Sequence, residues 1–226
     1  MYMPQKPGCE INPVGRPREE NILTSANDLT KNIKRVIFTE EEIKAKIAEA
    51  GRELSEKYAG KPLLLVSILN GAFVFMADFC RAVTIPCEIA FMCAKSYYNG
   101  TVSSGEVTIT KDLTQDISGY HVVILEDIID TGRTLKAVVE LLKKRDPLTL
   151  EVITLLDKPS RRAVEFEADK ALFTIPDYFV IGYGLDCGEK YRTAGRLVPL
   201  RHRHSRCSHI CPGCIPERPN IRVDRR

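Results

Sequence analysis

Three carboxylates and two hydroxyls follow one another closely after an aliphatic run. The run Val122–Leu125 leads into Glu126 and Asp127, and then into Asp130 and the segment Thr131–Thr134. Where such a segment opens a helix, backbone N–H groups point outward and favour an anion, and the two threonines add hydroxyl donors. The two acids directly after the run are placed to accept hydrogen bonds from ribose hydroxyls. The stretch therefore offers partners for both parts of a ribose phosphate.

A purely structural interpretation has these carboxylates cap the helix and solvate a loop. That interpretation would be preferred for a lone Asp-Thr-Gly. Three acids at the end of an aliphatic strand, followed by Thr-Gly-x-Thr, favour a binding site instead.

The elements around this stretch alternate between strands and helices. Strands are predicted at residues 63–69, 87–94, 121–125, 150–156 and 179–183. Helices are predicted at residues 43–58 behind a Thr39–Glu42 capping box, from the turn at 70–71 through 82, and at 135–143. The alternation implies an α/β fold with a mostly parallel sheet flanked by helices, which binds ligands at the carboxyl ends of its strands.

The chain divides into three parts by composition. Residues 1–32 are rich in Pro, Gly, Asn and charge without periodicity, which predicts a disordered extension. Residues 33–200 form the predicted domain, and residues 201–226 form a basic tail with Cys and His that is also predicted to be disordered. Within the domain, residues 95–112 are polar, which is typical of a long mobile loop or hairpin that acts as a lid.

The bulk composition excludes several classes of protein. Apolar residues make up 44% and charged residues 28% of the chain, the balance of a soluble globular protein. The net charge of +3 is too small to argue for nucleic acid as a partner. No apolar run approaches the ~18 residues of a membrane helix, and we find no secretory signal. Eight cysteines without an export signal favour a reduced, cytoplasmic protein.

The stretch from Val122 onward resembles the donor-binding motif of type I phosphoribosyltransferases. Further matching segments occur in the order of that family at residues 69–71, 95–98, 155–158 and 175–186. Together they are similar to the hypoxanthine-guanine phosphoribosyltransferases, over about residues 33–192.

The resemblance implies a purine-salvage enzyme with a small hood and a mobile lid over its sheet. Such enzymes transfer the 5-phosphoribosyl group from phosphoribosyl pyrophosphate (PRPP) to hypoxanthine or guanine, giving IMP or GMP and pyrophosphate, in a Mg²⁺-dependent reaction. The resemblance also implies a homodimer or homotetramer.

The same resemblance assigns roles to the residues of the donor site. Asp130 is the expected proton acceptor from the purine ring. Glu126 and Asp127 are expected to bind ribose and, with Asp186, to contact metal. The expected 5-phosphate loop consists of Thr131, Gly132, Arg133 and Thr134. Mg²⁺ prefers few carboxylates plus phosphate oxygens and water, so no dedicated protein cage is expected.

Pyrophosphate is expected to bind at Leu69, Asn70 and Gly71, together with Arg192. Many relatives carry Lys where this chain has Asn70. In the family the peptide at this place is cis, which would turn backbone N–H groups toward pyrophosphate. From the residues alone, an ordinary Asn-Gly turn is the preferred interpretation.

The purine is expected to contact Lys158, Phe179, Val180 and Asp186, and the lid to include Ser96 and Tyr97. In the family the lysine binds O6 of the base, the aromatic ring stacks on it, and the next backbone unit reads its edge. Without the resemblance, Lys158 would be interpreted as a surface lysine and Phe179 as a core residue.

The family pattern stops after Arg192. Residues 197–200 are a partial replacement for the strand that relatives have there, although Pro199 cannot donate to a ladder. Cysteines and a histidine at short spacing in the tail invite a zinc interpretation, at Cys207, His209, Cys211 and Cys214. A disordered tail, with a shifted reading frame as one origin, is the preferred alternative.

Three other functions remain open at this stage. One is transfer to xanthine or a pyrimidine, the second is a PRPP-sensing regulator that binds nucleic acid, and the third is a zinc-binding interaction module built on the tail.

Overall fold

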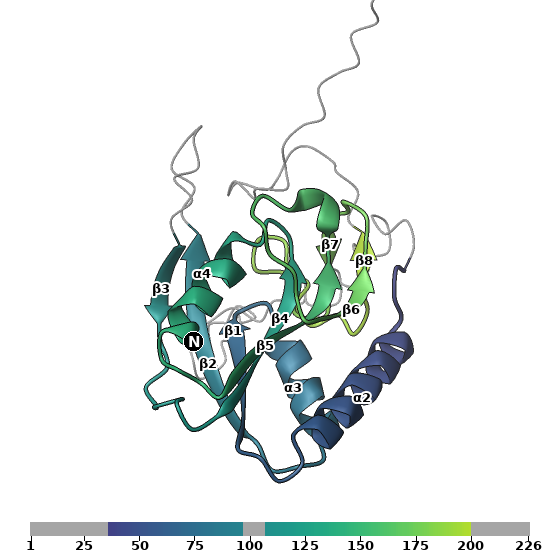
Figure 1. Cartoon of the computed structure of the whole chain (residues 1–226). Helices are drawn as coiled ribbons and strands as arrows, with labels where there is room; N and C mark the ends of the chain where they lie inside the picture. Colours follow the sequence, from purple (N-terminus) through teal and green to yellow (C-terminus); the bar gives the residue numbers. More distant parts are fainter. Residues whose placement is uncertain (1–35, 97–106, 200–226) are drawn as a thin grey trace, which may run out of the picture. The chain divides into compact units, whose positions relative to one another are not determined.

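A computed structural model describes residues 36–96 and 107–199, with Lys95 and Ser96 described by their backbone alone (Figure 1). The predicted N-terminal extension, the tail with its cysteines and the lid residue Tyr97 lie outside the described residues. In the part that is described, no helix is long and apolar enough to cross a membrane.

A six-stranded sheet forms the centre of the domain, in the order β3-β2-β1-β4-β5-β6. Its strands are β1 (Leu63–Leu69), β2 (Glu88–Ser96), β3 (Val107–Lys111), β4 (His121–Ile129), β5 (Thr149–Asp157) and β6 (Lys170–Thr174). Every neighbouring pair is parallel except β2–β3, which is an antiparallel hairpin at one edge. The predicted mostly parallel α/β fold is confirmed, and within residues 95–112 the described residues 95–96 pair antiparallel with residues 107–108.

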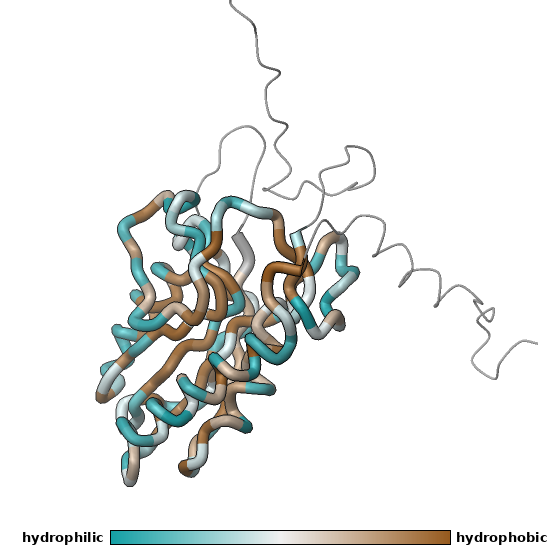
Figure 2. The backbone as a smooth tube through the Cα atoms, turned by 90° about the vertical axis from the view of Figure 1, so that its right-hand side faces the viewer, coloured by the Kyte–Doolittle hydropathy of each residue, from teal (hydrophilic) through white to brown (hydrophobic). Residues whose placement is uncertain are grey.

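Helices cover both faces of this sheet (Figure 1). Side chains alternate between the faces along each strand, so Val123 and Leu125 of β4 pack with α2 (Glu40–Lys57) and α3 (Phe73–Ala82). Val122 and Ile124 pack with α4 (Arg133–Lys143). The strands at the centre carry the hydrophobic colours in Figure 2. This double coverage explains the continuous aliphatic runs in the sequence.

The capping box predicted for the first helix is present. The amide of Glu42 donates to the Thr39 hydroxyl (3.2 Å), and the amide of Thr39 donates to the Glu42 carboxylate (2.8 Å). These bonds satisfy amides at the helix start and set where α2 begins.

The assignment of residues 179–183 to the main sheet was wrong. Only β7 (Val180–Ile181) is a strand there, and it pairs antiparallel with β8 (Val198–Pro199) in a separate two-stranded sheet. β7 ends early because Gly182 and Tyr183 have positive φ angles, 95° and 50°, which an extended strand does not contain. The sixth strand of the main sheet is β6, which lacks a strong apolar run and was not predicted.

The small sheet, which we call the hood, is connected by hydrogen bonds to the first described residues of the domain. Leu197 is fully buried and exchanges backbone hydrogen bonds with Ile37 (2.9 Å) and Phe38 (3.1 Å). The hydroxyl of Tyr183 donates to the carboxylate of Asp78 on α3. Of residues 197–200, Val198 and Pro199 form the short strand β8 beside β7.

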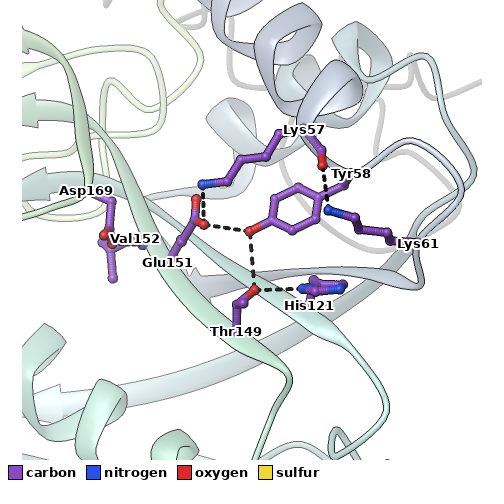
Figure 3. A network of polar contacts seen from close by, with 8 residues as sticks. All are labelled: Lys57, Tyr58, Lys61, His121, Thr149, Glu151, Val152 and Asp169. Atoms are coloured by element: carbon purple, nitrogen blue, oxygen red, sulfur yellow. Dashed lines mark hydrogen bonds and ion pairs between the residues drawn. The ribbon is translucent and has the colours of Figure 1, made fainter.

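A polar network closes the opposite end of the sheet from the carboxyl ends of its strands (Figure 3). The buried Tyr58 donates to Glu151 (2.6 Å), and its hydroxyl lies 3.2 Å from that of Thr149. Thr149 also contacts the His121 ring nitrogen at 2.9 Å, while Lys57 pairs with Glu151. The end of α2 is thus fixed to the starts of β4 and β5.

Candidate active site

The predicted site residues converge where the parallel strands end. The loops after β1, β4 and β5 lie at this edge, because parallel neighbours end on the same side. Glu126 and Asp127 lie within β4, since that strand runs to Ile129 rather than ending at Leu125 as predicted.

The loop after β1 presses against a carboxylate of β4. A Cβ atom at Gly71 would stand 1.8 Å from Oδ2 of Asp127, and a Cβ atom at Gly184 would stand 2.1 Å from the carbonyl oxygen of Gly71. The Leu69–Asn70 peptide is cis, as the resemblance implied. Two side-chain-free positions thus let Asp127, the loop at 70–71 and the segment at 184 come together.

Burial shifts the pKa of both adjacent acids of β4 upward. Burial raises the pKa of Asp127 to about 6, against the opposing effect of the Ile128 amide, which donates to Oδ1 (2.8 Å). Burial, and then the charge of Asp127, raise the pKa of Glu126 well above its usual range. Oε2 of Glu126 is buried and has no hydrogen-bond partner within the described residues. Such a group gains strongly from a cation or a donor brought by a ligand.

Arg192 lies beside this pair, engaged in its own loop. Its guanidinium donates to the Gly184 carbonyl (2.9 Å) and pairs with Asp186 and Glu189, each at 3.0 Å. The charge of Arg192 lowers the pKa of Asp127 and that of Asp186 raises it. The structure therefore brings Asp127, Asp186 and Arg192 into one electrostatic neighbourhood.

The predicted phosphate loop starts α4. Gly132 is the N-cap at φ 79°, a backbone conformation that L side chains rarely adopt. The Arg133 amide donates to the Thr131 hydroxyl at 3.4 Å. The loop thus places the first amides of the helix and the two threonines directly after the acids of β4.

Two arginines that the sequence did not single out hold Asp130. Nε of Arg161 donates to Oδ1 of Asp130 (3.1 Å), and Arg162 donates to the Asp130 carbonyl oxygen (2.7 Å). Arg161 is the last residue of the short 3-10 turn Pro159–Arg161 behind β5, and Arg162 follows it. A sequence signal exists in retrospect, because two adjacent arginines lie in the loop that follows β5.

The predicted purine residues occupy two elements. Lys158 is buried, and its amide donates to the carbonyl oxygen of Ile129 (3.0 Å), so it lies next to Asp130 in space. The interpretation of Lys158 as a surface residue is therefore wrong. Val180 is buried in β7 of the hood and Phe179 is half-buried directly before it.

Within the described residues, no three His, Cys, Asp or Glu side chains are grouped so as to hold a metal ion by themselves. Glu126, Asp127 and Asp186 are oxygen donors, which suits Mg²⁺ that arrives with phosphate oxygens better than a metal held in a protein cage.

Comparison with known proteins shows the family of this chain. The model of the phosphoribosyl transferase domain family matches residues 36–187. The chain belongs to the phosphoribosyltransferase family. Hypoxanthine phosphoribosyltransferase of Salmonella typhimurium is 49% identical over 175 residues, which cover 75% of this chain and 98% of the relative.

Two further members of the family are similar to this phosphoribosyltransferase. Hypoxanthine-guanine phosphoribosyltransferase of Streptococcus pneumoniae is 47% identical over 173 residues, covering 76% of this chain and 96% of the relative. The crystal structure of a hypoxanthine phosphoribosyltransferase from Staphylococcus aureus superposes with a TM-score of 0.74 at 44% identity, covering 77% of this chain and 95% of that one.

Proposed function

We propose that this phosphoribosyltransferase transfers the 5-phosphoribosyl group of PRPP to hypoxanthine or guanine in purine salvage, giving IMP or GMP and pyrophosphate. The observation that carries the proposal is the β4–α4 segment, where the half-buried Glu126, the buried Asp127, a further carboxylate and a phosphate-type loop follow one another at the carboxyl edge of the sheet. Two similar relatives are named for hypoxanthine and for hypoxanthine and guanine, respectively.

The transfer exchanges one bond at the anomeric carbon for another. A purine ring nitrogen forms the new bond as the bond to the pyrophosphate oxygen breaks, and that electron pair leaves with pyrophosphate. The ring proton passes to a carboxylate oxygen of Asp130. While it is ionised, Asp130 also stabilises the positive charge that develops on the ribose.

The remaining residues hold the donor and limit access of water. Thr131–Thr134 bind the 5-phosphate, and the loop at Leu69–Gly71 binds pyrophosphate. Arg192 gives up one of its carboxylate partners and pairs with pyrophosphate instead. Mg²⁺, when bound, supplies charge neutralisation of the leaving group, and Glu126, Asp127 and Asp186 are the residues that would hold it. The buried, unpartnered Oε2 of Glu126 supports this fit.

Selection of the base rests on Lys158, Phe179 and Val180. The ammonium group of the buried Lys158 favours an oxygen over an amino group at position 6, because an amino group donates and does not accept. Phe179 stacks on the ring and the backbone of Val180 reads its edge. The unit in solution is proposed to be a homodimer or homotetramer in the cytoplasm, which gel filtration and fractionation would measure.

The test is nucleotide formation from PRPP and Mg²⁺ with hypoxanthine, guanine, xanthine, adenine and uracil in parallel. IMP and GMP are the expected products. The matched control is Asp130→Asn, which keeps the size of the side chain but removes the proton acceptor, and should lower kcat by ~100-fold or more. Preferred use of xanthine or uracil would replace the proposed substrate. PRPP binding without nucleotide formation would point to a regulator.

A further inference from the structure

Two consecutive arginines contact different parts of Asp130. Arg162 binds the main chain, since its Nη1 donates to the carbonyl oxygens of Asp130 (2.7 Å) and Ile129 (3.3 Å), while its Nη2 pairs with Asp157. Arg161 binds the side chain, through Nε to Oδ1 at 3.1 Å. The backbone and the carboxylate of Asp130 are thus held by separate groups.

The same guanidinium reaches a second carboxylate. Nη1 of Arg161 lies 3.6 Å from Oδ2 of Asp177, which stands two residues before Phe179. Asp177 lies at the entry to the hood, whereas Asp130 lies after β4 of the main sheet. Arg161 therefore joins the residue assigned to the purine proton with the segment assigned to the purine ring.

The planar guanidinium suits this bridge better than an ammonium would. Its N–H groups point in fixed directions, so a donor on one edge can orient one carboxylate while another edge faces a second. A hydrogen bond from Arg161 to one oxygen limits rotation of the Asp130 carboxylate. At the partial exposure of both groups, orientation matters more than the energy of the ion pair.

We propose that Arg161 is a positioning residue for this transfer, which orients the carboxylate of Asp130 toward the purine and couples it to the hood through Asp177. The inference rests on the proposed function. Arg161 does not touch the donor in this scheme, so its loss should affect the chemical step and purine binding while leaving donor binding unchanged.

The experiment compares Arg161→Ala, Arg161→Lys and Asp177→Asn with wild type in steady-state kinetics for both substrates. Arg145→Ala is the matched control, because Arg145 also pairs with a carboxylate, Asp112, at similar exposure and outside the site. We expect Arg161→Ala to lower kcat by about 10- to 100-fold, the scale of a misplaced catalytic group. The KM for PRPP should stay within about twofold, and the melting temperature should match that of the control.

The two other variants separate geometry from charge. Arg161→Lys retains the charge without the fork, so it should recover part of the lost kcat. Asp177→Asn should raise the KM for hypoxanthine more than it lowers kcat, because it weakens only the link to the hood.

Specific results would overturn the inference. A kcat of Arg161→Ala within about threefold of wild type, or a lysine variant no better than alanine, would do so. A joint change of kcat, PRPP KM and melting temperature would indicate a merely structural role. An active wild type that loses activity on Asp130→Asn but not on Arg161→Ala would leave the proposed function standing and remove this inference alone. An inactive wild type would overturn both.

Discussion

The carboxylate of Asp127 lies directly against Gly71, at a place where a single added carbon would stand 1.8 Å from Oδ2. Two segments far apart in the sequence, the loop after β1 and the end of β4, therefore meet through the Asp127 side chain, which occupies the space that a side chain at position 71 would need. This contact joins the proposed pyrophosphate loop to the proposed ribose and metal acids.

Gly71→Ala should disrupt this contact. The added methyl group would overlap Oδ2 of Asp127, so either the loop or the Asp127 side chain must move. We expect kcat/KM for PRPP to fall by ~100-fold, since displacement of about 1 Å at a reacting site has effects of that scale. Gly119→Ala is the control, because nothing lies within 4 Å of its Cβ position. Equal kinetics for both variants would contradict the prediction.

Asp127→Asn should change how stability depends on pH. The folded-state pKa of Asp127 is about 6 against an ordinary value of 3.8, so between these values the folded chain holds a proton that the unfolded chain has lost. Stability from this group is thus fully present below about pH 4 and is lost as pH rises through about 6. A shift of about two units corresponds to about 3 kcal/mol.

The asparagine variant lacks this titration. In the absence of ligands it should therefore be more stable than wild type at pH 7.5, with the difference shrinking toward pH 4, while PRPP binding is lost. Urea denaturation across this range, paired with PRPP titration, measures both effects. Glu126→Gln should act in the same direction, because the pKa of Glu126 is also raised. Parallel stability curves for variant and wild type would refute the assignment.

Lys158→Ala should weaken discrimination among purines. The lysine is buried beside the end of β4, so its removal takes away a charged donor that O6 of a 6-oxopurine would use. We expect kcat/KM for hypoxanthine to fall ~10-fold or more, with the KM for PRPP changed far less. Adenine should be excluded less strongly. Unchanged hypoxanthine kinetics would place specificity elsewhere.

Truncation should separate the hood from the tail. A chain ending at Leu200 keeps β8 and should retain its melting temperature and activity, because residues 201–226 have few apolar side chains to bury. A chain ending at Arg196 also loses the fully buried Leu197 and the backbone bonds to Ile37 and Phe38, at a cost of about 3 kcal/mol or more. If the chain ending at Leu200 lost cooperative melting and also lost zinc that the full chain binds, the Cys207–Cys214 cluster would be structural.

The sequence by itself determined the strands β1, β2, β4 and β5 of the sheet and the β4–α4 segment. Strands 63–69 and 121–129 are aliphatic over most of their length because both faces are covered, and their runs are visible without any partner. The candidate ribose-phosphate site was visible because its acids, threonines and glycine are contiguous. A site can be predicted from the sequence when one continuous segment supplies its residues.

Only the tertiary structure decided how other segments join this site. The contact of Gly71 with Asp127, the bridge from Arg161 to Asp130 and Asp177, and the burial of Lys158 depend on residues brought together by parallel strand order. The hood strand at 180–181 was misassigned for the same reason. Its two residues are defined by pairing with 198–199, and a two-residue strand carries no periodicity of its own.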